Sequence, residues 1–179
     1  MSRQPKSVLN PTTQINKLCQ PSGGPTKPMA STDYLLNLNK SKLGAYYWLF
    51  VIMKKSGCRV SEALNIRVAA ISPEGRILIK GLKRGKDRVI EMRDILDYVK
   101  IRVPKCDLLF HGLNRFTGYR LLKDIGIGRL KKGRKHRSVT HIFRDDFVKD
   151  VRATIATDRA TSDAIGHKSI KSTEYYGKD

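Results

Sequence analysis

One segment of the chain is apolar on every side of a predicted helix, which restricts the folds that can contain it. Residues 44–57 read GAYYWLFVIMKKSG, with an unbroken apolar run from Ala45 to Met53. A helix without a polar face needs neighbours all round, so we expect it at the centre of a core. Gly57 is suited to end it. The run is well short of a membrane span, and the first residues lack the apolar stretch of a signal peptide.

The segments around this helix predict a mostly helical fold with one small sheet. Residues 33–38 form a helix before it, and a short helix begins near Val60. Residues 76–81 and 88–92 read as two strands that are joined by a basic turn. The fold class is therefore α+β, mostly helical with a small antiparallel β-sheet. Further helices are expected over 93–103, 117–126, 140–156, 159–166 and 170–176.

The chain divides near residue 31. Residues 1–31 predict a basic, disordered arm, because they are rich in proline and polar residues and residues 1–30 contain no acidic residue. Residues 32–179 are expected to form one domain, since 179 residues suffice for one ordinary core and are too few for two. The prolines of the arm are Pro5, Pro11, Pro21, Pro25 and Pro28.

Charge indicates the class of partner. The 36 Lys and Arg outnumber the 16 Asp and Glu and give a formal net charge of +20, which favours a polyanion. Charge alone also fits a ribosomal or membrane-surface protein, so the motifs must decide.

Cys19, Cys58 and Cys106 show no paired spacing and predict free thiols in a reducing compartment. We expect a soluble, cytoplasmic protein that does not associate with membranes.

Two arginines and a histidine are candidates for holding a phosphate. Guanidinium groups match phosphate oxygens two at a time and stabilise charge as phosphorus becomes pentacoordinate, and Arg59 and Arg144 are the candidates. His141 lies three residues before Arg144, which places both on one face of a helix. Taken singly, each arginine also fits a solvated surface residue, and the histidine fits one that is bonded to backbone.

A lysine and a tyrosine complete a set suited to phosphodiester cleavage without a metal. Lys83 lies in the predicted hairpin turn, from which an ammonium can protonate a departing 5′ oxygen; Arg84 and Lys86 are rivals by composition. Tyr176, nine residues after His167, can attack phosphorus and conserve the bond energy as a 3′-phosphotyrosine, so ATP is not required. We expect no cofactor and no metal, since no acidic cluster suggests a metal site.

Two basic runs are candidates for binding the DNA backbone. The first, residues 80–88, spans the predicted hairpin turn, and the second, residues 129–137, lies just before His141. Both would confer affinity for DNA without sequence choice. A solvated loop is the alternative for the second run. The predicted DNA-binding residues are Lys80, Arg84, Lys86, Arg88, Arg129, Lys131, Lys132, Arg134, Lys135 and Arg137.

Together these residues resemble the catalytic domain of the tyrosine recombinase, or phage integrase, family, from about Thr32 to Tyr176. Four segments carry the resemblance: GCRVSEALNIR, LKRGKDRVIEM, THIFRDDF and AIGHKSIKSTEYY. Their separations are similar to those of the family, with 24 residues from Arg59 to Lys83 and 23 from Arg144 to His167. The resemblance implies six catalytic residues, Arg59, Lys83, His141, Arg144, His167 and Tyr176, and favours Lys83 over its rivals and Tyr176 over Tyr175. It also gives Glu62 a position that supports Arg59.

The resemblance implies a site-specific DNA recombinase of the integrase or invertase type, which cleaves and rejoins DNA through a 3′-phosphotyrosyl intermediate. Double-stranded DNA is the implied partner, with self-association into a tetramer on DNA and an accessory DNA-binding protein as a further partner; bound to DNA, the protein would be nucleoid-associated. The alternative is a non-catalytic DNA-binding accessory protein derived from a recombinase. An RNA-binding protein ranks third, because no aromatic residues interleave in a strand pattern.

Three features depart from the family pattern. Asp145 follows the second arginine where the family more often has histidine, so local hydrogen bonding is expected to differ. The arm is too short to form the helical core-binding domain that usually clamps the other face of DNA. Only Gly177, Lys178 and Asp179 follow Tyr176, so a further helix that docks on a neighbouring protomer is not expected.

Overall fold

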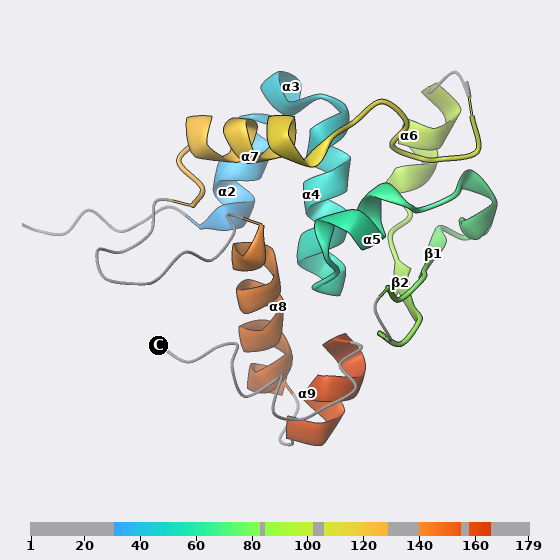
Figure 1. Ribbon diagram of the computed structural model, residues 1–179, viewed down its shortest axis with the longest axis vertical. Coiled ribbons are helices and arrows are strands. Elements are labelled where there is room, and N and C mark those ends of the chain that lie inside the picture. The colour runs from blue at the N-terminus through green and yellow to red at the C-terminus, as the bar shows by residue number, and fades with distance from the viewer. Residues whose placement is uncertain (1–30, 83–84, 102–105, 129–139, 155–157, 166–179) are drawn as a thin grey trace, which may run out of the picture. The chain divides into compact units, whose positions relative to one another are not determined.

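The computed structural model describes residues 31–82, 85–101, 106–128, 140–154 and 158–165 (Figure 1). The fold class predicted from the sequence is confirmed: the described part is mostly helical with one two-stranded antiparallel sheet. In chain order the elements are α2 (Thr32–Leu38), α3 (Lys40–Leu43), α4 (Ala45–Ser56), α5 (Val60–Leu64), the 3₁₀ helix η1 (Val68–Ala70), β1 (Arg76–Ile79), β2 (Arg88–Glu91), α6 (Ile95–Ile101), α7 (Arg115–Asp124), α8 (His141–Thr154) and α9 (Asp158–Ile165).

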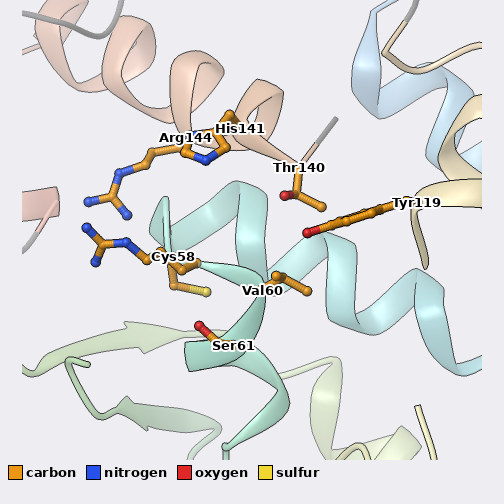
Figure 2. Close-up of a pocket in the computed structure, with 8 residues that line it drawn as sticks. Cys58, Val60, Ser61, Tyr119, Thr140, His141 and Arg144 are labelled. Atoms are coloured by element: carbon orange, nitrogen blue, oxygen red, sulfur yellow. The ribbon is translucent and has the colours of Figure 1, made fainter. Parts of the chain in front are cut away.

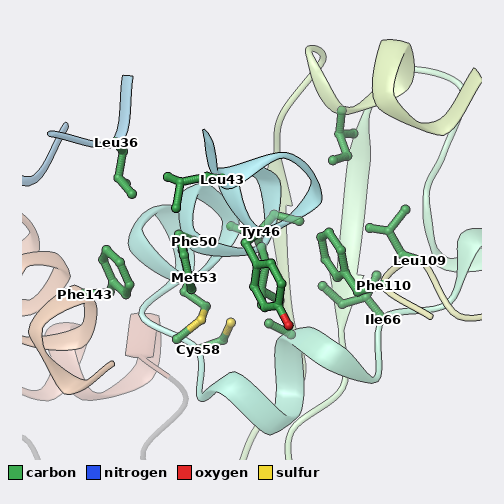
Figure 3. Close-up of a cluster of buried hydrophobic side chains, with 14 of the residues drawn as sticks. Leu36, Leu43, Tyr46, Phe50, Met53, Cys58, Ile66, Leu109, Phe110 and Phe143 are labelled. Carbon is green, nitrogen blue, oxygen red and sulfur yellow. The ribbon is translucent and has the colours of Figure 1, made fainter. Parts of the chain in front are cut away.

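Helix α4 forms the centre of the core, as its apolar sequence predicts. It contacts α2, α3, α5, α8 and β2, and Leu49, Phe50 and Ile52 are completely buried. Figure 3 shows side chains from several elements gathered around it, among them Phe143 of α8. The Phe143 ring stacks on Phe50 with 5.6 Å between centroids. Burial of apolar side chains, aliphatic and aromatic, is the main favourable contribution to folding.

The turn after α4 positions the start of α5. Gly57 follows the helix in the left-handed region, with φ 59° and ψ 18°, which glycine adopts at little cost. The chain then turns directly into Cys58 and Arg59, at the start of α5. Because Gly57 also lies against Phe147 of α8, this turn brings the beginning of α5 close to α8.

The sheet is a hairpin whose inner face belongs to the core. Strands β1 and β2 pair in the register Arg76 with Glu91 through Ile79 with Arg88. Ile77 and Ile79 are completely buried. Strand β2 ends one residue earlier than predicted, at Glu91, and β1 ends two residues earlier, at Ile79, where Asp87 closes the base of the loop. Its carboxylate pairs with Lys80 at 2.8 Å and accepts the Gly81 N–H at 2.9 Å.

Three details were not evident in the sequence. Helix α3 and η1 are too short to produce a recognisable apolar period. Helix α7 begins two residues earlier than predicted, because the Asn114 side chain accepts the Thr117 N–H at 2.9 Å and caps it.

The arm up to residue 30 and the predicted helix over 170–176 lie outside the described residues. Among the described helices, none has both the length and the apolar character that crossing a bilayer requires.

Candidate active site

A pocket of about 130 Å³ is lined by the first residues of α5, the first residues of α8 and Tyr119 of α7 (Figure 2). Three of the predicted catalytic residues line it: Arg59, His141 and Arg144. The fold thus brings together two motifs that are far apart in the sequence. The other lining residues are Cys58, Val60, Ser61, Tyr119 and Thr140.

Arg59 is held from behind by a carboxylate. Its backbone N–H donates to Glu62 Oε2 at 2.9 Å, and its Nη1 donates to Glu62 Oε1 at 3.0 Å. The Arg59 side chain is 38 % exposed, whereas that of Glu62 is 1 % exposed. Glu62 therefore fixes the position of the guanidinium without removing it from the pocket.

Glu62 also connects α5 to the hairpin. Its Oε2 forms a close ion pair with Arg88 Nη2, and its Oε1 accepts the Leu82 N–H at 3.4 Å. Burial alone would raise the pKa of Glu62, but the Arg59 backbone hydrogen bond and the Arg88 charge outweigh it and lower that pKa below 4.5. Glu62 is therefore ionised at neutral pH and has two arginine partners.

Arg144 is supported by the main chain of the α4–α5 turn. The residue is 2 % exposed, and its Nη1 donates to the Gly57 carbonyl oxygen at 2.9 Å. His141 is the first residue of α8 and is partly buried. In Figure 2 both side chains project from α8 on the side that faces the pocket. The predicted helical spacing of His141 and Arg144 therefore places them at one site.

Some of the lining residues were not identified as candidates from the sequence. Tyr119 belongs to no motif, and Thr140 has no assigned role in its motif, yet Figure 2 shows their hydroxyl groups turned toward the pocket. Thr140 is 6 % exposed and directly precedes α8. Burial raises the pKa of the Cys58 thiol to about 11, so this cysteine is protonated at neutral pH and is a poor nucleophile.

The described candidates for DNA binding occupy different environments. Lys80 pairs with Asp87, and Lys86 pairs with Asp163 of α9 at 2.6 Å; both lysine side chains are more than half exposed. The Arg88 side chain is only 9 % exposed, because it packs against Glu62. Its burial against Glu62 differs from the exposed position expected of a DNA contact.

The remaining predicted site residues lie outside the described part of the chain. Among them are the candidate general acid, the second histidine and the candidate nucleophile, together with most of the two basic runs. They are Lys83, His167 and Tyr176, and the basic residues Arg84, Arg129, Lys131, Lys132, Arg134, Lys135 and Arg137.

The chain is similar to known recombinases and integrases. The model of the phage integrase family matches residues 29–179. The tyrosine recombinase XerC of Leptospira interrogans is 28 % identical over 135 residues, which cover 70 % of this chain and 43 % of that protein. The chain therefore spans less than half the length of this relative.

Solved structures share the fold. The XerA recombinase superposes with a TM-score of 0.63 at 23 % identity, covering 87 % of this chain and 62 % of that one. The XerH recombinase, solved with its difH substrate in a pre-cleavage complex, superposes with a TM-score of 0.59 at 22 % identity, covering 82 % and 48 %.

Proposed function

The chain belongs to the phage integrase family, and from that premise we propose that it is the catalytic part of a site-specific DNA recombinase. The observation that carries the proposal is the meeting of Arg59, His141 and Arg144 in one pocket. Two guanidinium groups and an imidazole around a small cavity suit a phosphate whose charge rises during the reaction. We assign the catalytic domain to residues 32–179 and a basic arm to residues 1–31.

The proposed reaction is a transesterification that conserves the number of phosphodiester bonds. The phenol oxygen of Tyr176 gives its proton to a basic neighbour and attacks phosphorus, the bond to the 5′ oxygen breaks, and Lys83 gives that oxygen a proton. Arg59 and Arg144 bind the non-bridging oxygens, with His141 and His167 as further donors. Attack by a 5′ hydroxyl on the phosphotyrosine reverses these steps and rejoins a strand. The roles of Lys83, His167 and Tyr176 rest on the family resemblance.

Double-stranded DNA is the proposed partner. The net charge of +20 supports a polyanionic partner, and XerH was solved bound to its own DNA substrate. Lys80 and Lys86 are exposed enough for a phosphate to replace Asp87 and Asp163 as their partners. We further propose assembly into a tetramer on DNA, an accessory DNA-binding protein as a partner, and a cytoplasmic location on nucleoid DNA.

A suicide substrate tests the proposal. It carries the recombination site with a nick near the cleavage position, so that a short fragment diffuses away and the covalent complex accumulates. We expect an adduct that resists denaturant with the wild type and none with Tyr176→Phe. EDTA should leave the rate unchanged, because guanidinium groups stabilise the charge. Salt-sensitive binding without an adduct would instead favour the non-catalytic DNA-binding protein.

The two arginines should affect the rate of cleavage more than the affinity for DNA. Arg59→Ala and Arg144→Ala are each expected to slow adduct formation by about 10² or more, because each removes a preorganised donor to the developing charge. Arg67→Ala is the matched control, since the Arg67 side chain is 70 % exposed and does not line the pocket. If both pocket variants weaken DNA binding in proportion to the rate, the assigned roles are wrong.

A further inference from the structure

Tyr119 is the lining residue whose role the proposed chemistry leaves open. Of the described residues that line the pocket, it alone carries a phenol. Figure 2 shows the Tyr119 side chain and the Arg144 guanidinium on opposite sides of the labelled group, with the Tyr119 hydroxyl pointing inward near Val60 and Thr140. The pocket therefore has a cationic end and an end that offers neutral hydroxyl groups.

The core holds Tyr119 in place. The Tyr46 hydroxyl of α4 donates to the Asn114 carbonyl oxygen and accepts the Asn114 N–H, both at 3.0 Å, at the start of α7. One turn later, a Cβ added to Gly118 would lie 3.3 Å from Tyr46 Cε1 and 3.5 Å from the Phe50 ring. Glycine at this position lets α7 pack directly on α4. Tyr119, the next residue, is thus attached to the buried core around α4.

The ring of Tyr119 is oriented by its neighbour on the same helix. It meets the Phe116 ring edge to face, with 6.4 Å between centroids, and the Arg115 guanidinium lies 4.8 Å above Phe116. Among the residues that the structure describes, none forms a hydrogen bond with the Tyr119 hydroxyl. A phenol whose ring is fixed and whose hydroxyl faces a polar pocket is a preorganised donor.

The geometry of a DNA strand indicates what this donor binds. A phosphate held by Arg59 and Arg144 at the cationic end continues through a deoxyribose to the next phosphate of the strand. Val60 and the face of the phenol suit the sugar, and a tyrosine hydroxyl is a common ligand of backbone phosphates. We infer that the Tyr119 hydroxyl donates a hydrogen bond to a phosphate next to the scissile one and so fixes the register of the strand in the pocket. This inference rests on the proposed function.

The variant that tests the contact is Tyr119→Phe, which keeps the ring against Phe116 and removes only the hydroxyl. At DNA concentrations below saturation, adduct formation should slow about tenfold, the loss expected for one hydrogen bond to a charged group. At saturating DNA the rate should change less than about threefold, because a non-reacting phosphate is bound equally in the ground and transition states. Tyr34→Phe is the matched control, since Tyr34 of α2 is 59 % exposed and does not line the pocket.

Substrates with a single methylphosphonate identify the phosphate. The phosphate on each side of the scissile one is neutralised in turn, and the wild type and Tyr119→Phe are compared on both substrates. At the phosphate that Tyr119 contacts, the variant should cause no additional loss; at the other the two effects should multiply. The inference is overturned if they multiply at both positions, or if Tyr119→Phe matches the wild type on unmodified DNA.

The design separates this inference from the proposed function. If the wild type and Tyr34→Phe form the adduct while Tyr119→Phe shows no coupling to any phosphate, only the role of Tyr119 is lost. If the wild type forms no adduct, both proposals fail together.

Discussion

Arg59 and Arg144 line the same pocket, but different parts of the molecule support them. Arg59 is held by the carboxylate of Glu62, which Arg88 of the hairpin also contacts. Arg144 is buried and donates to the Gly57 carbonyl oxygen, at the turn between α4 and α5. One side of the pocket is therefore set by ionised groups, and the other by the position of a main-chain turn against the core.

The two kinds of support should respond to different substitutions. Ionic support depends on the ionised state of Glu62. It also links Arg59 to the hairpin, because Glu62 contacts Leu82 and Arg88. Main-chain support depends on the left-handed conformation of Gly57 and on its fit against Phe147. Substitutions at Arg88, Gly57 and Glu62 separate the two.

The largest expected effect is on the ionic side. Arg88→Ala should lower the free energy of unfolding by about 3 kcal/mol, because it removes one partner of a buried ion pair and leaves Glu62 less compensated. Urea titration of both proteins measures this. Arg76→Ala is the control, since the pair between Arg76 and Glu91 is more than half exposed and should contribute less than about 1 kcal/mol. Equal losses for the two variants would show that Arg88 is not a buried support.

The main-chain side comes next. Gly57→Ala should cost about 2 kcal/mol or more, because an L side chain is strained at φ 59° and its Cβ would lie 2.6 Å from Phe147 Cδ1. It should also slow DNA cleavage by displacing the carbonyl that holds Arg144. Gly112→Ala serves as the control, since its φ is 80° and nothing lies within 4 Å of the added Cβ. A loss no greater than that of the control would remove the packing argument.

The smallest effect is a dependence on pH that only the ionic side should show. The pKa of Glu62 is lower in the folded protein than its ordinary value of 4.5, so its ionised form contributes stability above that pH. The contribution is lost as pH falls through the lowered pKa. Glu62→Gln should therefore be less stable than the wild type by about 1 kcal/mol at pH 7.

Thermal unfolding between pH 7 and pH 3 measures this difference, which should shrink below about pH 4.5. If the difference in stability between Glu62→Gln and the wild type stays constant from pH 7 to pH 3, the ionised state assigned to Glu62 is wrong. Gly57→Ala compared in the same way should keep its deficit, because no titrating group carries the support from Gly57.

Some features of the fold and the site could be predicted from the sequence and others could not. The central position of α4 was predictable, because a helix that is apolar on every side must be packed all round. The meeting of Arg59 with Arg144 was implied by the resemblance of the motifs to the family. Arg88 looked like any other residue of a basic run, and only its burial against Glu62 distinguishes it. Tyr119 could not be identified, because its position depends on the packing of Gly118 against Tyr46 and Phe50, which are distant in the sequence.

The most direct test of the central claim is to identify the residue that becomes attached to DNA. Wild-type protein trapped on a suicide substrate is digested with protease and nuclease, and the peptide that carries a nucleotide is sequenced by mass spectrometry. The proposed chemistry predicts a single attachment, at Tyr176. Attachment at Tyr119, whose proposed role is to bind the strand, or at Tyr175 would contradict it, as would the absence of any attachment on a site that the protein recombines.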